Sequence, residues 1–223
     1  KDHHMPKNYD ISLKAYGGGG NAKSLNPIPK KLKTQSMKGF ENQYKNIIDY
    51  IVRITFKIWE QKNIGYIYDT YSHDCRVWDE FGLQFGSEKI VTDTIHTNNA
   101  FPNIRLIADE VIWAGDEKAS FHTSHRTIIT GKNSGFSKFS APTGKSVRLL
   151  CIANCVAKNN KIYYENVVYD TAALIKQLGL NVNEIAKEVA DKGNVGPFAP
   201  DFKNSKPKRV TSETKPLSFE ISK

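Results

Sequence analysis

Apolar residues recur at helical spacing in the first half of the chain and predict three helices there. The longest covers residues 40–62. Its inward stripe consists of Tyr44, Ile47, Ile48, Ile51, Ile54, Thr55, Ile58 and Trp59. A shorter helix is predicted for residues 64–71, followed by a strand-like piece at residues 75–78. The third helix is predicted for residues 87–97, with Ser87 as its N-cap.

From residue 104 onward the pattern alternates, which is typical of strands with one buried face. It predicts four strands, at residues 104–114, 119–130, 147–157 and 161–169. Asn159 and Asn160, between the last two strands, predict a tight hairpin turn. Asp170 is then expected to be the N-cap of a helix that runs to about residue 177, with Gly179 as its C-cap. A last short helix is predicted for residues 182–190.

Helices followed by four sequential antiparallel strands predict an α+β fold, in one domain of residues 40–192. Residues 1–39 and 193–223 lack periodicity and are expected to be a flexible basic extension and an extended basic tail. The glycines at residues 17–20 resemble part of a phosphate-binding loop. However, Pro27 and Pro29 forbid the helix that would hold the phosphate, so a flexible linker is expected.

The formal net charge of +9 invites the interpretation of a nucleic-acid-binding protein, but its distribution argues against one. Residues 1–39 carry +6 and residues 193–223 carry +3. The predicted domain between them holds 18 basic and 18 acidic residues and is therefore neutral. Because solvated tails commonly carry such charge, we predict no nucleic-acid partner.

The cysteine content and the absence of long apolar segments predict a cytoplasmic protein. Three cysteines do not suit a disulfide framework. Cys151 and Cys155 would lie about 13 Å apart on one predicted strand, too far to form a bridge. No stretch approaches the roughly 20 apolar residues that span a bilayer, and the polar N-terminus does not resemble a signal peptide. We therefore expect reduced thiols and no membrane partner.

An ordered set of short motifs resembles the SnoaL-like branch of the nuclear transport factor 2-like superfamily, over about residues 40–180. The motifs are Phe101-Pro102 with Arg105, Asp109–Trp113, Thr123–Arg126, Pro142–Lys145, Lys161-Ile162 with Glu165 and Asp170, and Gln177–Leu180. The resemblance implies a cone-shaped, curved antiparallel sheet closed by N-terminal helices around a pocket. It also implies pairing through the sheet face into a homodimer. One departure is Asn166, because such sequences commonly have Trp at this position.

The resemblance implies one of two functions, because the superfamily contains enzymes as well as non-catalytic modules. The first is cofactor-independent acid/base catalysis by a cyclase, isomerase or dehydratase on a small hydrophobic carbonyl compound. The second is non-catalytic binding of a hydrophobic ligand, or dimerisation. The sequence contains no dinucleotide fingerprint, no metal-ligand spacing and no nucleophile elbow, so neither a cofactor nor a metal is expected.

Glu165 and Asp170 are the candidate catalytic carboxylates. Glu165 lies in an otherwise apolar strand, where a carboxylate is costly unless it faces a pocket or pairs with an arginine. Both alternatives remain open from the sequence. SnoaL-type cyclases have an essential pocket Asp, and Asp170 is one possible match. The N-cap role explains Asp170 equally well.

His122 and His125 are the other candidate acid/base residues. On a strand, residues three apart point to opposite faces, so the two imidazoles cannot chelate one metal and at most one faces the pocket. Arg126 needs a carboxylate partner, which Asp109, Glu110 or Glu165 can supply. Together with Arg126, the expected pocket walls are Trp59, Tyr71, Trp78, Trp113 and Tyr164. Aromatic residues of this kind often belong simply to the core.

Overall fold

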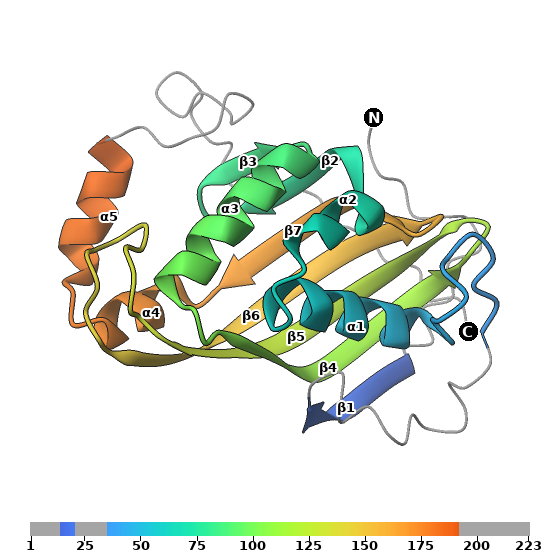
Figure 1. The fold of residues 1–223 in the computed structure, drawn as a ribbon, viewed down its shortest axis with the longest axis horizontal. Helices are drawn as coiled ribbons and strands as arrows, with labels where there is room; N and C mark the ends of the chain where they lie inside the picture. The colour runs from blue at the N-terminus through green and yellow to red at the C-terminus, as the bar shows by residue number, and fades with distance from the viewer. Residues whose placement is uncertain (1–13, 21–34, 192–223) are drawn as a thin grey trace, which may run out of the picture.

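The computed structural model describes residues 14–20 and 35–191, and the remaining parts of the predicted extension and tail lie outside the described residues. Helices cover one face of a single bent sheet (Figure 1). The elements in chain order are β1 (Lys14–Gly20), α1 (Ile47–Trp59), η2 (Ile64–Tyr66), α2 (Ile67–Thr70), β2 (Tyr71–Asp79), β3 (Gly82–Phe85), α3 (Ser87–Ala100), β4 (Arg105–Asp116), β5 (Ser120–Lys132), β6 (Ser146–Lys158), β7 (Lys161–Tyr169), α4 (Thr171–Gln177) and α5 (Val182–Asp191).

The sheet has seven strands in the order β1-β4-β5-β6-β7-β2-β3. Strands β4 to β7 pair antiparallel with their neighbours, which confirms the predicted meander. Strand β2 pairs parallel with β7, and β3 then folds back along β2 as a hairpin. The sequence pattern did not predict β3, because four residues are too few to establish an alternation.

Strand β1 is a second difference from the prediction. Residues 17–20 were expected to be a flexible linker, whereas the structure pairs Lys14–Gly20 with the free edge of β4. Four consecutive glycines carry no side chains from which a period can be read. Backbone hydrogen bonds along an open sheet edge are sufficient to place such a segment, and they leave no trace in the hydrophobic pattern.

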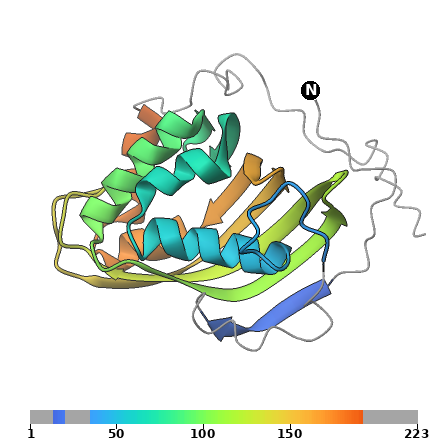
Figure 2. The same cartoon turned by 45° about the vertical axis from the view of Figure 1, so that its right-hand side comes forward.

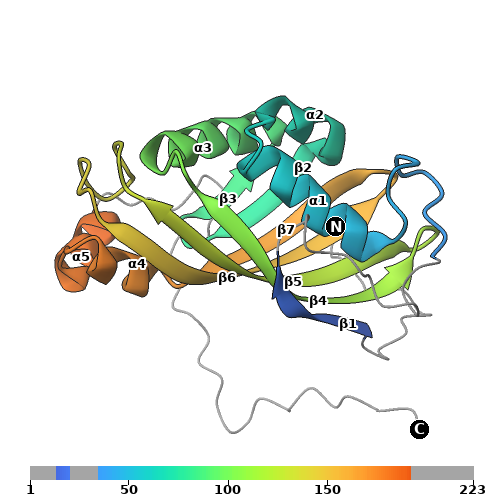
Figure 3. The same ribbon diagram turned by 60° about the horizontal axis from the view of Figure 1, so that its bottom comes forward.

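Helix α1 packs its apolar stripe onto the sheet, as predicted, but it covers Ile47–Trp59 and not the whole of residues 40–62. Asn46 is its N-cap, because the Asn46 Oδ1 atom accepts a hydrogen bond of 2.9 Å from the backbone N–H of Asp49. The side chains of Ile47, Ile51 and Ile54 are at most 2% exposed. Figures 2 and 3 show α1, α2 and α3 on the same face of the sheet, which bends beneath them. The α+β fold class is therefore confirmed.

The predicted turns and caps of the second half are confirmed. Asn159 and Asn160 have φ angles of 49° and 63°, which is the conformation of a two-residue hairpin turn. The Asp170 side chain accepts a hydrogen bond of 3.0 Å from the Ala173 N–H and caps α4. Gly179 follows α4 with a φ of 81°, as expected of a C-terminal glycine. For α3 the prediction was wrong by one residue, since the cap is Gly86 and not Ser87.

The three cysteines, Cys75, Cys151 and Cys155, are buried free thiols. This agrees with the expectation from their odd number and from the spacing of Cys151 and Cys155. Among the described residues, no helix is both long enough and apolar enough to cross a bilayer.

Candidate functional site

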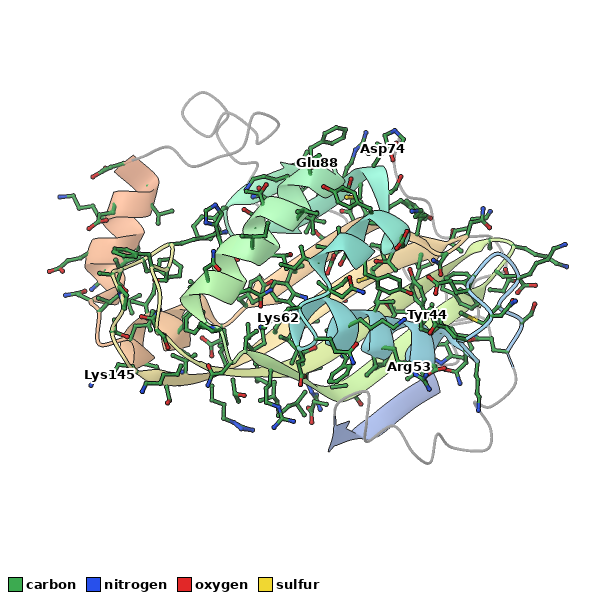
Figure 4. The ribbon with its side chains drawn as sticks, viewed as in Figure 1. Tyr44, Arg53, Lys62, Asp74, Glu88 and Lys145 are labelled. Atoms are coloured by element: carbon green, nitrogen blue, oxygen red, sulfur yellow. The ribbon has the colours of Figure 1, made fainter. Side chains whose placement is uncertain are left out.

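A cavity of about 520 Å³ lies between the inner face of the sheet and the helices that cover it. Strands β2, β5, β6 and β7 form its floor, while α1 and α3 form its walls. Its outer rim combines three segments: the β2–β3 turn, the loop between β5 and β6, and the start of α4. In Figure 4, Lys145 at the end of that loop lies at the α4 end of the domain, and Tyr44 lies at the opposite end.

Glu165 lines this cavity from β7 and is only 8% exposed. The Tyr71 hydroxyl donates a hydrogen bond of 3.0 Å to the Glu165 Oε2 atom. Burial raises the pKa of Glu165 to about 7, although hydrogen bonds from Tyr71 and Cys155 favour its charged form. Within the described part of the chain Glu165 forms no ion pair. Of the two sequence alternatives, the pocket-facing one therefore describes Glu165.

A bulge in β7 places Glu165 on the inner face. Cys155 pairs with Glu165 and Val156 with Tyr164, but Ala157 pairs with Ile162, so Tyr163 is the additional residue. Ile162, 1% exposed, and Glu165 consequently both point inward although they are three residues apart. Strict alternation along β7 would put Tyr163 on the same face as Glu165. Instead, the Tyr163 hydroxyl contacts the Ser120 hydroxyl and the residue does not line the cavity.

His125 lines the same cavity from β5, whereas His122 does not. The two histidines therefore lie on opposite faces, as the spacing predicted. The His125 imidazole is 3% exposed, and burial lowers its pKa to about 4, so it is neutral near pH 7. Among the described residues, its Nε2 atom has no hydrogen-bond partner. A neutral, buried imidazole with an unpaired nitrogen can bind a polar atom of a ligand.

Asp170 and Arg126 lie outside the cavity lining. Asp170 acts as the N-cap of α4, which is the structural alternative that the sequence left open. Arg126 is paired with Asp109 and Glu110, two of the three partners considered, but its side chain is 45% exposed. The expectation that Arg126 is a pocket residue is corrected, because its position in β5 alternates with His125 and places it on the outer face.

Among the five predicted aromatic walls, Trp59 and Tyr71 line the cavity and three do not. Trp113 packs against Phe121, with ring centroids 6.3 Å apart, and belongs to the core. Trp78 alternates with the lining residue Val77 and so faces away from the cavity. Tyr164 accepts a hydrogen bond of 3.0 Å from Asn166 on the outer side of β7. In all three cases, the aromatic residue type alone did not indicate whether the side chain faces the cavity.

Sequence reasoning missed the rim of the cavity. The rim includes Glu80 and Phe81 of the β2–β3 turn, Lys138 and Phe139 of the β5–β6 loop, and Thr171 at the start of α4. The available signal was the length of the loop, residues 131–145, since long loops inside compact domains are often functional. The contact between this loop and the β2–β3 turn is a product of the fold and has no counterpart in the sequence.

Comparison with proteins of known structure identifies the type of fold. No family model and no curated protein matches the sequence. A candidate SnoaL-like polyketide cyclase from Jannaschia sp. CCS1 matches with a TM-score of 0.55 at 13% identity, over 66% of this chain and 99% of its own. TsrD from Streptomyces laurentii matches with a TM-score of 0.53 at 12% identity, over 60% and 96% of the two chains.

IdmH, a candidate polyketide cyclase from Streptomyces antibioticus, matches with a TM-score of 0.51 at 15% identity, over 60% of this chain and 98% of its own. At such identities, the likeness concerns the fold. This chain has the curved α+β cone fold of SnoaL-like proteins, as its motifs predicted.

Proposed function

We propose that this SnoaL-like cone holds an acid/base active site for a small, hydrophobic carbonyl compound, with Glu165 as the group that transfers the proton. One observation carries the proposal. Glu165 is a buried carboxyl that lines an apolar cavity, has a pKa raised to about 7 and makes no ion pair within the described residues. A carboxyl whose pKa lies near the working pH is suited both to accept and to return a proton.

In the proposed reaction, the Glu165 carboxylate removes a proton from the carbon next to the ligand's carbonyl group. The enolate or enol that results then reacts further by cyclisation, isomerisation or loss of water, and Glu165 returns the proton where the reaction requires it. Burial raises the pKa of Tyr71 well above its ordinary value, so its hydroxyl stays protonated and keeps the carboxylate oriented. This chemistry needs only groups that the chain itself supplies.

His125 is the second polar group of the proposed site. Strand β6 lies between β5 and β7, and His125 and Glu165 are offset by two residues along it, so their backbones are about 12 Å apart. A flat apolar ligand can lie between the two side chains, with its carbonyl oxygen towards the neutral imidazole. The cavity volume of about 520 Å³ suits a small organic molecule. The free, buried thiols fit a reducing compartment, and a cytoplasmic location is part of the proposal.

The experiment that tests this assignment is the replacement Glu165→Gln, which keeps the shape of the side chain and removes the transferable proton. A variant that binds ligands normally and whose turnover equals that of the wild type would favour the non-catalytic, ligand-binding alternative.

The outer face of the sheet supports a second proposal, a homodimer formed through that face. Leu150, Ile152 and Val168 alternate with cavity-lining residues and are 50%, 40% and 62% exposed on the other side of the sheet. Ile152 pairs directly with Val168, and Leu150 with Ile128, so the apolar side chains form one continuous patch. Arg126, Asp109 and Glu110 lie beside it and supply both signs of charge, which suits a self-complementary, two-fold interface.

The double variant Leu150→Glu with Val168→Glu is expected to be monomeric, because it places like charges opposite one another across the two-fold interface. Analytical ultracentrifugation at micromolar concentration should give about twice the chain mass of 25.1 kDa for the wild type and the chain mass for the variant. Ile95→Glu is the matched control, since Ile95 is a comparably exposed apolar residue (42%) on α3. A wild-type chain that sediments as a monomer would contradict the proposal.

A further inference from the structure

The rim of the cavity contains a positively charged group that rests on an aromatic ring. The Lys138 Nζ atom lies 4.4 Å from the centre of the Phe81 ring. The ring of Phe139, the next residue along the loop, lies 6.2 Å from that of Phe81 at an interplanar angle of 34°. All three residues line the cavity. The β2–β3 turn and the β5–β6 loop thus meet at the mouth and form a site that accommodates an ammonium group.

Hydrogen bonds and close packing hold the base of the loop that carries Lys138. Asn133 is fully buried, and its Nδ2 atom donates to the carbonyl oxygens of Ala100 (3.3 Å) and Gly135 (2.9 Å). Its Oδ1 atom accepts from the Thr143 backbone N–H (2.8 Å) and hydroxyl (2.9 Å). Gly135 leaves no space for a side chain, because a Cβ atom there would lie 2.1 Å from the Asn99 carbonyl oxygen.

The charges around the Phe81 ring favour a cation. Asp79 and Glu80 precede Phe81, and both line the cavity. The Asp79 Oδ1 atom accepts from the Phe81 N–H at 2.8 Å and from Gln84 at 3.3 Å, and the Glu80 Oε1 atom accepts from the Thr171 hydroxyl at 3.0 Å. Burial raises the pKa of the Glu80 carboxyl, whereas the hydrogen bond from Thr171 and the nearby Lys138 favour its charged form. Lys138 supplies one positive charge against the two carboxylates, and it forms no ion pair in the part of the chain that the structure describes.

The other charged side chains of the lining do not alter this balance. Asp93 is paired with Lys89, and Glu165 lies on the sheet floor. Counted formally, Asp79, Glu80 and Lys138 give the mouth a net charge of one negative unit. A ligand anion would meet two carboxylates, whereas a ligand cation would compete only with one long, flexible lysine side chain.

We propose that the mouth binds a positively charged amine or quaternary ammonium group of the ligand on the Phe81 ring, beside Glu80, in the position that the Lys138 ammonium occupies. The apolar body of the ligand then extends inward, towards the sheet. Independent support that the cavity is built for a ligand comes from His125, 3% exposed and with its Nε2 atom unpaired among the described residues. The inference requires the cavity to be the ligand site, but it does not depend on the chemistry proposed at Glu165.

Three matched probes test the charge preference: 4-phenylbutylamine, 4-phenylbutan-1-ol and 4-phenylbutanoate, titrated calorimetrically into the full chain at pH 7.5. The amine is expected to bind about 3- to 30-fold more tightly than the alcohol, which is the range of a cation–π contact, and the carboxylate more weakly than both. Equal affinity for all three probes, or no binding of the amine, would overturn the proposal.

Four variants test which residues cause the preference for the amine over the alcohol. Lys138→Met is expected to tighten amine binding severalfold, because it removes the competing ammonium, while Glu80→Gln and Phe81→Leu are expected to reduce the preference for the amine over the alcohol. Lys132→Met, at the end of β5 and outside the cavity lining, is the matched control and should change nothing.

Two further outcomes would contradict the proposed position of the cation. Tightest binding by the carboxylate, lost in Lys138→Met, would make the mouth an anion site. An amine preference that disappears in Glu165→Gln but persists in Glu80→Gln would place the cation at the sheet floor. Amine binding to Glu165→Gln therefore tests the cation site at the mouth, whereas turnover by the same variant tests the proposed catalysis.

Discussion

Glu165→Gln is expected to lower turnover by roughly 10²–10⁴-fold, the usual contribution of a general acid or base. Glutamine has nearly the same shape as glutamate and can still accept the hydrogen bond from Tyr71, so folding and ligand affinity should be kept. The measurement is the single-turnover rate of the variant with any carbonyl compound that the wild-type chain converts. The loss should fall on the rate of the chemical step and not on the dissociation constant.

Glu117→Gln is the matched control for this variant, because Glu117 lies in the turn between β4 and β5, outside the cavity lining. Its turnover should equal that of the wild type. If Glu165→Gln and Glu117→Gln behave alike, Glu165 is not the proton-transferring group. If Glu165→Gln instead abolishes ligand binding, Glu165 is a binding residue and the proposed catalytic role is wrong.

Glu165→Gln is also expected to stabilise the fold at alkaline pH by on the order of 3 kcal/mol. The pKa of Glu165 is about 7 in the folded chain and near 4.5 when it is exposed. Between these values the folded state binds more protons than the unfolded state, so the wild type loses stability as pH rises through this window. At about 1.4 kcal/mol per unit, the full loss is present above pH 7 and absent below pH 4.5. The glutamine variant is not subject to this loss.

His125 contributes to the pH dependence of the folding stability with the opposite sign. Its pKa is about 4 in the folded chain and near 6.5 when it is exposed, so the folded state binds fewer protons between these values. Its contribution to stability is therefore present above pH 6.5 and lost as pH falls towards 4. In the wild type the two contributions oppose one another between pH 4.5 and 6.5. In Glu165→Gln only the His125 contribution remains, and stability should rise through that range.

Thermal melting at pH 4.5 and pH 8 measures this difference. The two proteins should melt together at pH 4.5, and the variant should melt roughly 6–12 °C higher at pH 8, at 2–4 °C per kcal/mol for a domain of this size. A midpoint at pH 8 that is lower in the variant would show that Glu165 is half of a structural ion pair. Subtracting the wild-type change in midpoint between the two pH values from that of the variant removes the contributions of groups that titrate alike in both proteins.

The long periodic segments were predictable from the sequence because their side chains repeat one pattern many times. The stripe from Ile47 to Ile58 and the alternation in β4 to β7 fixed the element types and the antiparallel meander. Short or featureless segments were not predictable. Strand β3 has only four residues, and β1 ends in glycines, so sheet pairing rather than sequence pattern determines both.

The candidate site was predictable where alternation decides the face of a strand. Alternation correctly separated His122 from His125. For Glu165 the apolar surroundings left both a pocket and an arginine pair open, and the structure places it in the cavity lining. The prediction was wrong for Arg126, Trp78, Trp113 and Tyr164, which were selected by residue type and not by face. The rim of Phe81, Lys138 and Phe139 depends on contact between two segments more than 50 residues apart, and a single sequence carries no signal for such a contact.

The titration of Glu165 itself tests directly whether this residue is the proton-transferring group. Carbon-13 NMR of chain labelled at the glutamate side-chain carboxyl carbon gives one signal per residue, and comparison with Glu165→Gln assigns the signal of interest. We predict a midpoint near pH 7 and a shift of that midpoint when a carbonyl ligand occupies the cavity. A midpoint at or below pH 4.5, unaffected by such a ligand, would show a solvated carboxylate and contradict the proposed active site.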